Sequence, residues 1–228
     1  MTSRYFTSRT QAGQMLAELI TPDYQDKPCA VVALSEGGVM VAAQIALKLK
    51  AVLAMLLVQT IDIPAETDSI GAVNEKGSFA YNRTYSAGEV EELMMDYRGY
   101  VEDQKRASMT GIHTLLGNYS GLRAELVRNK HVFLVSDGLN TGLSLDIAME
   151  FLKPVSIKEL IIVSPIASPE AVDRMHILGD KIYCLSVIDN YLATEHYYER
   201  KDVPRREDVV KIVEEVMEKW QEPLKKVL

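Results

Sequence analysis

Short apolar runs alternate along the chain with longer stretches in which apolar residues recur at helical spacing. The apolar runs are expected to be strands, and they lie at 29–34, 52–58, 132–135, 160–163 and 182–187. The periodic stretches are expected to be helices, at 9–20, 39–49, 86–116, 145–152, 170–177 and 207–220. Strands that alternate with helices predict an α/β fold with an open, mostly parallel, doubly wound sheet flanked by helices.

Local signals are expected to bound or interrupt these elements. Ser144 is expected to cap the helix that starts at residue 145. Proline and glycine predict a loop between Pro22 and Pro28, weak points at Gly99 and Gly111, a hairpin turn at 76–77 and a turn at 164–169.

The last predicted helix carries an apolar stripe, formed by Val209, Ile212, Val213, Val216 and Trp220. Such a stripe is more typical of packed core, or of a dimer contact, than of a ligand site. The helix at 86–116 offers a second surface for pairing. We therefore expect the chain to form a homodimer.

A strand, a glycine-containing turn and a helix N-terminus follow one another within 132–144. This arrangement suits an anion, because the turn amides converge and the helix dipole adds about half a positive charge. Gly138 and Gly142 let the backbone come close to a ligand, and the Thr141 and Ser144 hydroxyls can donate to phosphate oxygens. The alternative is an ordinary strand-to-helix turn with a capping serine, and these residues alone leave the two interpretations equal.

Two further features belong to the same edge of the predicted sheet. Asp137 ends the strand at 132–135 and is placed to accept hydrogen bonds from sugar hydroxyls. A second glycine turn follows the first strand, with the sequence Ser35, Glu36, Gly37, Gly38. Ligands of open parallel sheets bind outside the carboxyl ends of the strands, so both turns are expected to line one site.

The charge and composition of the chain indicate which kinds of partner this site can bind. The net charge is −7 and the pI about 5.2, and Lys and Arg form no cluster, which argues against binding to a nucleic-acid backbone. The opening residues lack the apolar segment of a secretory signal, and no apolar run is long enough to cross a membrane, so we expect a cytoplasmic protein. The two cysteines lack metal-ligand spacing and the four histidines are scattered, so no protein-held metal site is expected.

The stretch at 132–144 resembles the ribose-phosphate loop of the type I phosphoribosyltransferases, where four apolar residues precede two acids and a loop ending Thr-Gly-x-Ser/Thr. Ser136 stands in place of the first acid, and the other motif positions are kept at Asp137, Gly138, Thr141, Gly142 and Ser144. Further matches recur in order over nearly the whole chain, at Phe6, Arg9, 12–13, 37–39, 70–73, Pro165, 167–172 and 197–198.

The resemblance implies a single domain over 1–228, with a small hood over the sheet formed by 61–82 and 189–204. It implies a small-molecule partner that contains phosphorylated ribose, either 5-phosphoribosyl 1-pyrophosphate or a nucleoside monophosphate, with Mg²⁺ as the accompanying cofactor. Asp137 would be the catalytic candidate. The ligand-binding residues would be Ser35, Glu36, Gly37, Gly38, Ser136, Asp137, Gly138, Leu139, Asn140, Thr141, Gly142 and Ser144.

The residues that hold pyrophosphate in the resembled family are changed here. Glu36 stands where the first turn has arginine, and Gln59 and Thr60 stand where the next strand ends in Arg-Lys. No Lys or Arg lies between Lys50 and Lys76. A charge-assisted phosphate contact is worth about 1.5–3 kcal/mol, so the loss of two or three would weaken pyrophosphate binding by roughly 10³-fold.

Three interpretations of the activity stay open. The chain is a transferase with unusual electrostatics, or it binds the sugar phosphate without transfer as a sensor or partner-binding module, or it is an enzyme of another class such as a hydrolase. The family favours the first, the residues favour the second, and the third lacks a nucleophile–base pair. Tyr191 and Tyr197 are candidates for stacking on a base or for packing against the hood.

Overall fold

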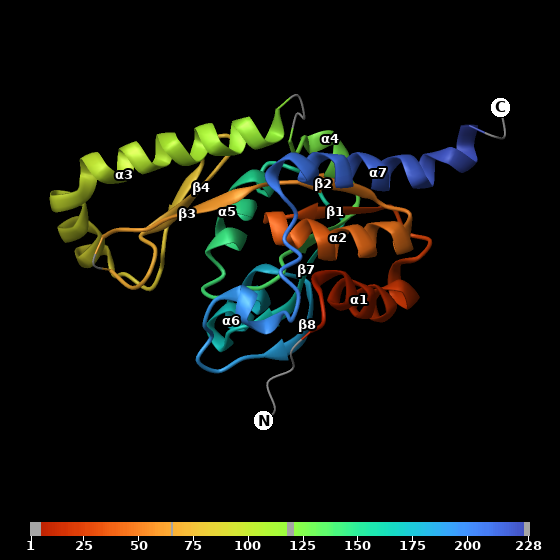
Figure 1. Ribbon diagram of the computed structural model, residues 1–228, viewed down its shortest axis with the longest axis horizontal. Helices are drawn as coiled ribbons and strands as arrows, with labels where there is room; N and C mark the ends of the chain where they lie inside the picture. The colour runs from red at the N-terminus through yellow and green to blue at the C-terminus, as the bar shows by residue number, and fades with distance from the viewer. Residues whose placement is uncertain (1–5, 65, 118–120, 226–228) are drawn as a thin grey trace.

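The computed structural model describes residues 6–64, 66–117 and 121–225, and it contains a central sheet of five parallel strands (Figure 1). In spatial order these strands are β2 (Val52–Met55), β1 (Cys29–Ala33), β6 (His131–Val135), β7 (Glu159–Ala167) and β8 (Lys181–Val187). The order places β1 and β6 side by side at the centre, with chain crossovers running to both sides. The predicted open parallel α/β sheet is confirmed.

Helices cover both faces of this sheet, because alternate residues of the central strands point to opposite sides. Val31 and Phe133 pack on one side, where the helices are α1 (Arg9–Tyr24), α2 (Glu36–Leu49) and α7 (Arg206–Lys225). Val32 and Leu134 pack on the other side, where the helices are α4 (Ala124–Val127), α5 (Leu143–Leu152) and α6 (Pro169–Leu178). The sheet is therefore buried on both faces, as its continuous apolar strands predicted.

A second, antiparallel sheet projects from the body of the molecule beneath the long helix α3 (Ala87–Leu116) (Figure 1). It consists of β3 (Val58–Ile61), β4 (Gly71–Asn74) and β5 (Phe79–Tyr81) in that order. Gly77 has a φ of +79° at the turn between β4 and β5, so the predicted hairpin is confirmed. Ile61, Ile70 and Val73 pack with Val101 of α3, which gives this part its own small apolar cluster.

Three element boundaries differ from the predictions. The run at 52–58 divides into β2 and β3, which belong to different sheets, so Gln59 and Thr60 lie in the small sheet. The helix α1 continues through Pro22, where the missing N–H costs only one bond near the helix end. The helix α3 runs unbroken through Gly99 and Gly111, because a capping box at Ser86 and packing of its buried residues outweigh about 1 kcal/mol per glycine.

The strand β7 is also longer than predicted, since it extends through Ser164 and Pro165 to Ala167. Its pairing with β6 ends at Val163, and beyond that point it pairs with β8 and, at Ala167, with Leu139 of the loop after β6. A proline is tolerated there because one side of the strand needs no N–H donor. The expected turn at 164–169 is thus reduced to Ser168, which caps α6.

The helix α7 buries the apolar stripe that the sequence indicated. Val209, Val213 and Val216 pack in the same apolar cluster as residues of α2 and β2, which supports core packing, and the side chain of Trp220 lies outside the described part. Among the described helices, none combines the length and the apolar composition that a membrane span requires.

Candidate functional site

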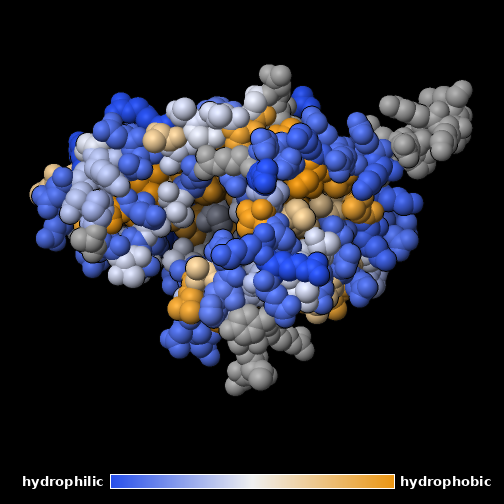
Figure 2. All heavy atoms as spheres, viewed as in Figure 1, coloured by the Kyte–Doolittle hydropathy of each residue, from blue (hydrophilic) through white to orange (hydrophobic). Residues whose placement is uncertain are grey.

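A cavity of about 370 Å³ lies at the carboxyl edge of the parallel sheet, where the two glycine turns meet. A hollow between the part that carries α3 and the part that carries α6 is visible in Figure 2. The residues that line the cavity are Leu34, Ser35, Glu36, Gly37, Leu57, Val58, Gln59, Ser136, Asp137, Gly138, Ser144, Thr194, Glu195 and Val203. The structure thus brings together seven of the predicted residues, whereas Gly38, Leu139, Asn140, Thr141 and Gly142 lie outside this lining.

The first turn is shorter than the sequence indicated, because α2 starts at Glu36 and not at residue 39. Ser35 is the N-cap, and its Oγ accepts a hydrogen bond of 2.9 Å from the N–H of Gly38. Glu36, Gly37 and Gly38 therefore form the first helical turn. A Cβ atom on Gly37 would overlap the Asp137 carboxylate and lie 2.6 Å from Arg9 Nε, so this position has no room for a side chain.

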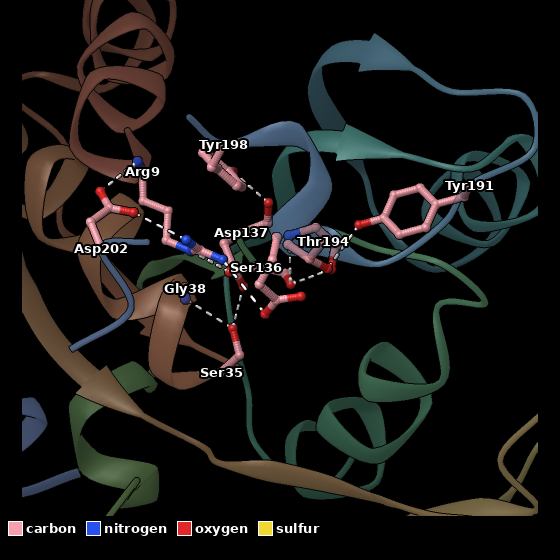
Figure 3. Close-up of polar contacts among 11 residues, drawn as sticks. Arg9, Ser35, Gly38, Ser136, Asp137, Tyr191, Thr194, Tyr198 and Asp202 are labelled. Atoms are coloured by element: carbon pink, nitrogen blue, oxygen red, sulfur yellow. Dashed lines mark hydrogen bonds and ion pairs between the residues drawn. The ribbon is translucent and has the colours of Figure 1, made fainter. Parts of the chain in front are cut away.

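Arg9 is the site residue that the sequence analysis missed as a functional group. Its side chain is fully buried at the start of α1, and its Nε donates to Asp137 Oδ2 at 2.7 Å (Figure 3). Its Nη1 donates to Asp202 Oδ1 at 3.0 Å, and the guanidinium lies 4.3 Å from the ring centre of Tyr198. Burial opposes the charge, but attraction and hydrogen bonding to Asp137 outweigh it and raise the pKa of Arg9. The available signal was a charged residue in helical register with the buried Ala12 and Leu16.

Both carboxylate oxygens of Asp137 already accept a hydrogen bond from the protein. Its Oδ2 accepts from Arg9, and its Oδ1 accepts from the Ser35 hydroxyl at 2.7 Å. The Tyr198 hydroxyl donates to the Asp137 carbonyl oxygen at 2.6 Å, and burial followed by the charge of Asp137 raises the pKa of Tyr198. The carboxylate is only 10% exposed, yet it still forms part of the cavity wall. Arg9 and Ser35 therefore fix its orientation, and Arg9 balances its charge.

The loop after β6 is held by hydrogen bonds within the loop, to β7 and to Ser168. Ser136 Oγ donates to the Gly138 carbonyl at 2.8 Å. Leu139 bonds to β7 through its N–H, which donates to the Ile166 carbonyl at 3.1 Å, and its side chain packs in the apolar cluster beneath α5. Asn140 is exposed and its carbonyl accepts from the Ser168 hydroxyl. Leu139 and Asn140 thus hold the loop in place from outside the cavity lining.

The N-cap of α5 is Gly142, not Ser144, because the helix begins at Leu143. Gly142 has a φ of +74°, which a residue with a side chain rarely adopts. A Cβ there would lie 3.0 Å from Arg174 Cγ, so the glycine serves the backbone conformation and not an open cradle. Thr141 Oγ1 accepts from the Leu143 N–H at 3.4 Å, and Ser144 lies in the first helical turn facing the cavity.

The segment that follows β8 covers the other side of the loop. A Cβ on Gly138 would overlap Tyr191 Oη and lie 2.9 Å from Thr194 Oγ1. Tyr191 and Tyr197 have ring centres 5.2 Å apart, and both pack in the cluster that contains Phe6. The two tyrosines therefore pack behind the loop, and this segment contributes Thr194, Glu195 and Val203 to the cavity instead.

The charges around the cavity follow the sequence-based expectation. Its charged lining residues, within the part of the chain described, are the acids Glu36, Asp137 and Glu195. Gln59 lines the cavity, whereas Thr60 is exposed on the alternate face of β3. In the described ranges no three His, Cys, Asp or Glu side chains are grouped closely enough to hold a metal ion.

Comparisons with known proteins agree with this geometry. A family model described as "Phosphoribosyl transferase domain" matches residues 7–199. Two Mycobacterium tuberculosis proteins, from strains CDC 1551 / Oshkosh and H37Rv and each named "Putative phosphoribosyl transferase", are 24% identical over 200 residues. That match covers 86% of this chain and 43% of each relative, so the chain spans less than half the length of these relatives.

Solved structures support the same fold. The protein TT1426 from Thermus thermophilus is 28% identical, with a TM-score of 0.68 over 92% of this chain and 98% of that chain. AQ2163 from Aquifex aeolicus is 14% identical, with a TM-score of 0.50 over 90% of this chain and 86% of that chain. The second likeness concerns the fold alone.

Proposed function

The chain belongs to the phosphoribosyl transferase family, and from this premise we propose that its cavity binds a ligand that contains ribose 5-phosphate. The observation that carries the proposal is the convergence of the two glycine turns, at Ser35–Gly37 and Ser136–Gly138, on one cavity at the carboxyl edge of the sheet. Ligands of open parallel sheets bind at this edge.

The phosphate is proposed to lie at the first turn of α5. The helix dipole favours an anion there, and Ser144, which lines the cavity, carries a hydroxyl that can act as a further donor. Asp146, the acid in this turn, is paired with Arg174, whose Nε donates to it at 2.9 Å. Its negative charge is therefore balanced and opposes a bound phosphate less.

The sugar is proposed to lie in the cavity, against the wall that the two turns form together. Asp137 is there, pre-oriented by Arg9 and Ser35, and each carboxylate oxygen retains a lone pair for a sugar hydroxyl. Gly138 lines the same part of the cavity with its backbone, since the space that a side chain would take is filled by Tyr191 and Thr194. The pair of turns thus fits a phosphorylated sugar better than a free phosphate.

We further propose that transfer activity is reduced or lost. A transferase of this kind must bind pyrophosphate, and the part of the cavity near the start of α2 presents Glu36 and the neutral Gln59. The acids repel a ligand with several negative charges, and the loss of charge-assisted contacts weakens its binding by roughly 10³-fold. This charge pattern favours a binding protein, acting as a sensor or partner-binding module, over an efficient transferase.

If Mg²⁺ takes part in binding, the ligand's own oxygens would have to coordinate it. The acids near the cavity do not form a metal site, because both oxygens of Asp137 are held by Arg9 and Ser35 and no three ligating side chains group together among the described residues. No step of the proposed binding is therefore assigned to a metal.

The homodimer stays a proposal, and light scattering at micromolar concentration tests it directly, since a monomeric mass would refute it.

Isothermal titration of the purified chain with ribose 5-phosphate and with ribose tests the proposed function. We expect measurable binding of ribose 5-phosphate and much weaker binding of ribose, because the phosphate contacts supply most of the affinity. Equal affinities, or no heat with ribose 5-phosphate at millimolar concentration, would refute the proposal.

A further inference from the structure

The turn between β4 and β5 contains buried polar groups that have no hydrogen-bond partner among the described residues. Glu75 is only 7% exposed, and neither oxygen of its carboxyl group accepts a hydrogen bond. Asn74 is fully buried, and its Nδ2 donates to no acceptor although its Oδ1 accepts from the N–H groups of Lys76 and Ser78. Buried polar groups without partners are rare because each costs stability, so this turn is held closed against a penalty.

Glu75 lies at a contact between the small sheet and the body of the molecule. A Cβ on Gly121 would lie 3.1 Å from Glu75 Oε1, so the carboxyl group packs against the backbone that precedes α4. Beside it, Lys76 Nζ donates to the Leu122 carbonyl at 2.9 Å and lies 4.0 Å from the ring centre of Phe151 in α5. The turn is therefore docked on the body through Lys76, and the carboxyl group of Glu75 is enclosed in the same contact.

Burial governs the ionisation of Glu75. It raises the pKa of this carboxyl group and outweighs the nearby backbone N–H groups and the charges of Lys76 and His113, which all oppose the rise. Lys76 is engaged by the Leu122 carbonyl and the Phe151 ring, and His113 of α3 is exposed to solvent, which screens its charge. In the docked turn the acid therefore keeps its proton at a pH at which an exposed glutamate has lost it.

The docked turn is favoured only while this carboxyl group is protonated. Below the ordinary glutamate pKa of 4.5, the docked and the undocked turn both hold the proton, and docking carries no ionisation cost. As the pH rises above that value, the undocked turn ionises first. The docking equilibrium then weakens by up to about tenfold per pH unit, until the docked carboxyl group ionises as well. The docked turn is thus most stable in acid and less stable toward neutral pH.

We propose that Glu75 is a proton-controlled latch that sets how firmly the small sheet is docked on the body of the molecule. The latch acts on the cavity, because β3 of the same sheet carries Val58 and Gln59 in the cavity wall. The second attachment of the sheet is apolar, through Ala72 on Ile147 of α5, and it contains no titratable group. Opening of the latch therefore frees the turn without detaching the sheet, and the inference does not depend on the ligand that the cavity binds.

Hydrogen–deuterium exchange of the full chain, between about pH 5 and about pH 8 and corrected for intrinsic exchange, tests the latch. Protection of the Gly77 and Ser78 amides, which donate to Asn74, should fall by up to about tenfold per pH unit. Glu75→Gln has the shape of the neutral acid, so its protection should stay constant with pH. Glu92→Gln removes an exposed carboxylate from α3 and should behave as the unmodified chain.

Two further measurements separate the latch from its alternatives. His113→Asn should keep the pH dependence, because the proposal assigns it to Glu75 and not to the imidazole. NMR titration of the Glu75 carboxyl carbon in the unmodified chain should give a midpoint above that of Glu92, and this measurement decides alone if Glu75→Gln does not fold.

Three results would overturn the inference. These are protection that is independent of pH in the unmodified chain, the same pH dependence in Glu75→Gln, and loss of the dependence in His113→Asn. A Glu75 midpoint no higher than that of Glu92 would also overturn it. All of these outcomes leave the proposed function standing, since none of the measurements uses a ligand.

Discussion

The turn after β1 and the turn after β6 lie side by side in the wall of the cavity, and both lead from a buried parallel strand into a helix. After β1 the helix starts almost at once, with Ser35 as cap and Glu36 in the first turn. After β6 the chain makes a longer loop, which bonds to β7 through Leu139 before Gly142 starts α5. The first turn thus adds Glu36 to the cavity wall, whereas the acid of the second turn, Asp137, is paired with Arg9.

This difference separates two ways of building an anion site. A site made from backbone amides withstands substitution, because the helix dipole and the turn geometry persist when side chains change. A site that depends on arginine and lysine loses affinity when neutral or acidic residues replace them, and the resemblance places Glu36, Gln59 and Thr60 at such positions. On the proposed function, this chain keeps the phosphate half of the site and loses the pyrophosphate half.

The two turns are not independent, because Asp137 of the second contacts Ser35 of the first, with Arg9 bridging from α1. Replacing Arg9 by Met should produce the largest effect. It would leave Asp137 and Asp202 as partly buried acids without their cation, at a cost of about 3–5 kcal/mol. Urea unfolding measures the loss, with Arg106→Met as control because Arg106 is 75% exposed. Equal stability of the two variants would show that the bridge contributes nothing.

The glycines of the two turns should respond differently to alanine. Gly37→Ala must separate Arg9 from Asp137, so we expect a loss of about 3 kcal/mol from overpacking. Gly142→Ala meets only the flexible side chain of Arg174 and the strain of a positive φ, which together cost about 1–2 kcal/mol. Thermal unfolding of both variants gives the order, and a larger loss at Gly142 would contradict the packing seen around Gly37.

Positive charge placed at the first turn and at Gln59 should increase the affinity for 5-phosphoribosyl 1-pyrophosphate relative to ribose 5-phosphate. Glu36→Arg combined with Gln59→Arg should tighten binding of 5-phosphoribosyl 1-pyrophosphate by about a hundredfold or more, since each new charge-assisted contact contributes about 1.5 kcal/mol or more. The same pair should leave ribose 5-phosphate nearly unaffected. Thr60→Lys is the matched control, because Thr60 is exposed and lies outside the cavity lining. Similar gains from Thr60→Lys would indicate general attraction and not a local contact.

A smaller effect is expected when the carboxylate shared by both turns becomes an amide. Asp137→Asn keeps the shape but weakens the acceptor, so ribose 5-phosphate should lose about tenfold in affinity and inorganic phosphate much less. Calorimetry with both ligands, at a temperature where the variant is folded, measures the two losses. Equal losses would mean that Asp137 does not contact the sugar.

Much of the fold could be predicted from periodicity, because strands buried on both faces are continuous apolar runs and the helices between them carry one apolar face. Both turns could be placed at one edge for the same reason. The division of 52–58 between β2 and β3 could not, since membership of a sheet depends on pairing partners far along the chain. The start of α2 at Glu36 was missed because glycines usually indicate a loop, whereas here the Ser35 cap and the close approach of Asp137 hold them in a helix.

The sequence predicted the loop residues of the site but not the distant residue that pairs with them. Loop residues such as Asp137 and Gly138 carry a local pattern, so their place near a ligand could be inferred. Arg9 lies 128 positions from its partner Asp137, and nothing local to either residue indicates the pair. A buried charge in register with an apolar helix face is the one sign that the sequence offers, and it names no partner.

The measurement that tests the central claim most directly is calorimetric titration of the unmodified chain with ribose 5-phosphate and with 5-phosphoribosyl 1-pyrophosphate, each with and without Mg²⁺. The account predicts that ribose 5-phosphate binds as tightly as the pyrophosphorylated sugar or more tightly, because the phosphate half of the cavity is retained and the other half is acidic. Tight, Mg²⁺-dependent binding of 5-phosphoribosyl 1-pyrophosphate, or release of pyrophosphate with any nucleobase, would contradict it.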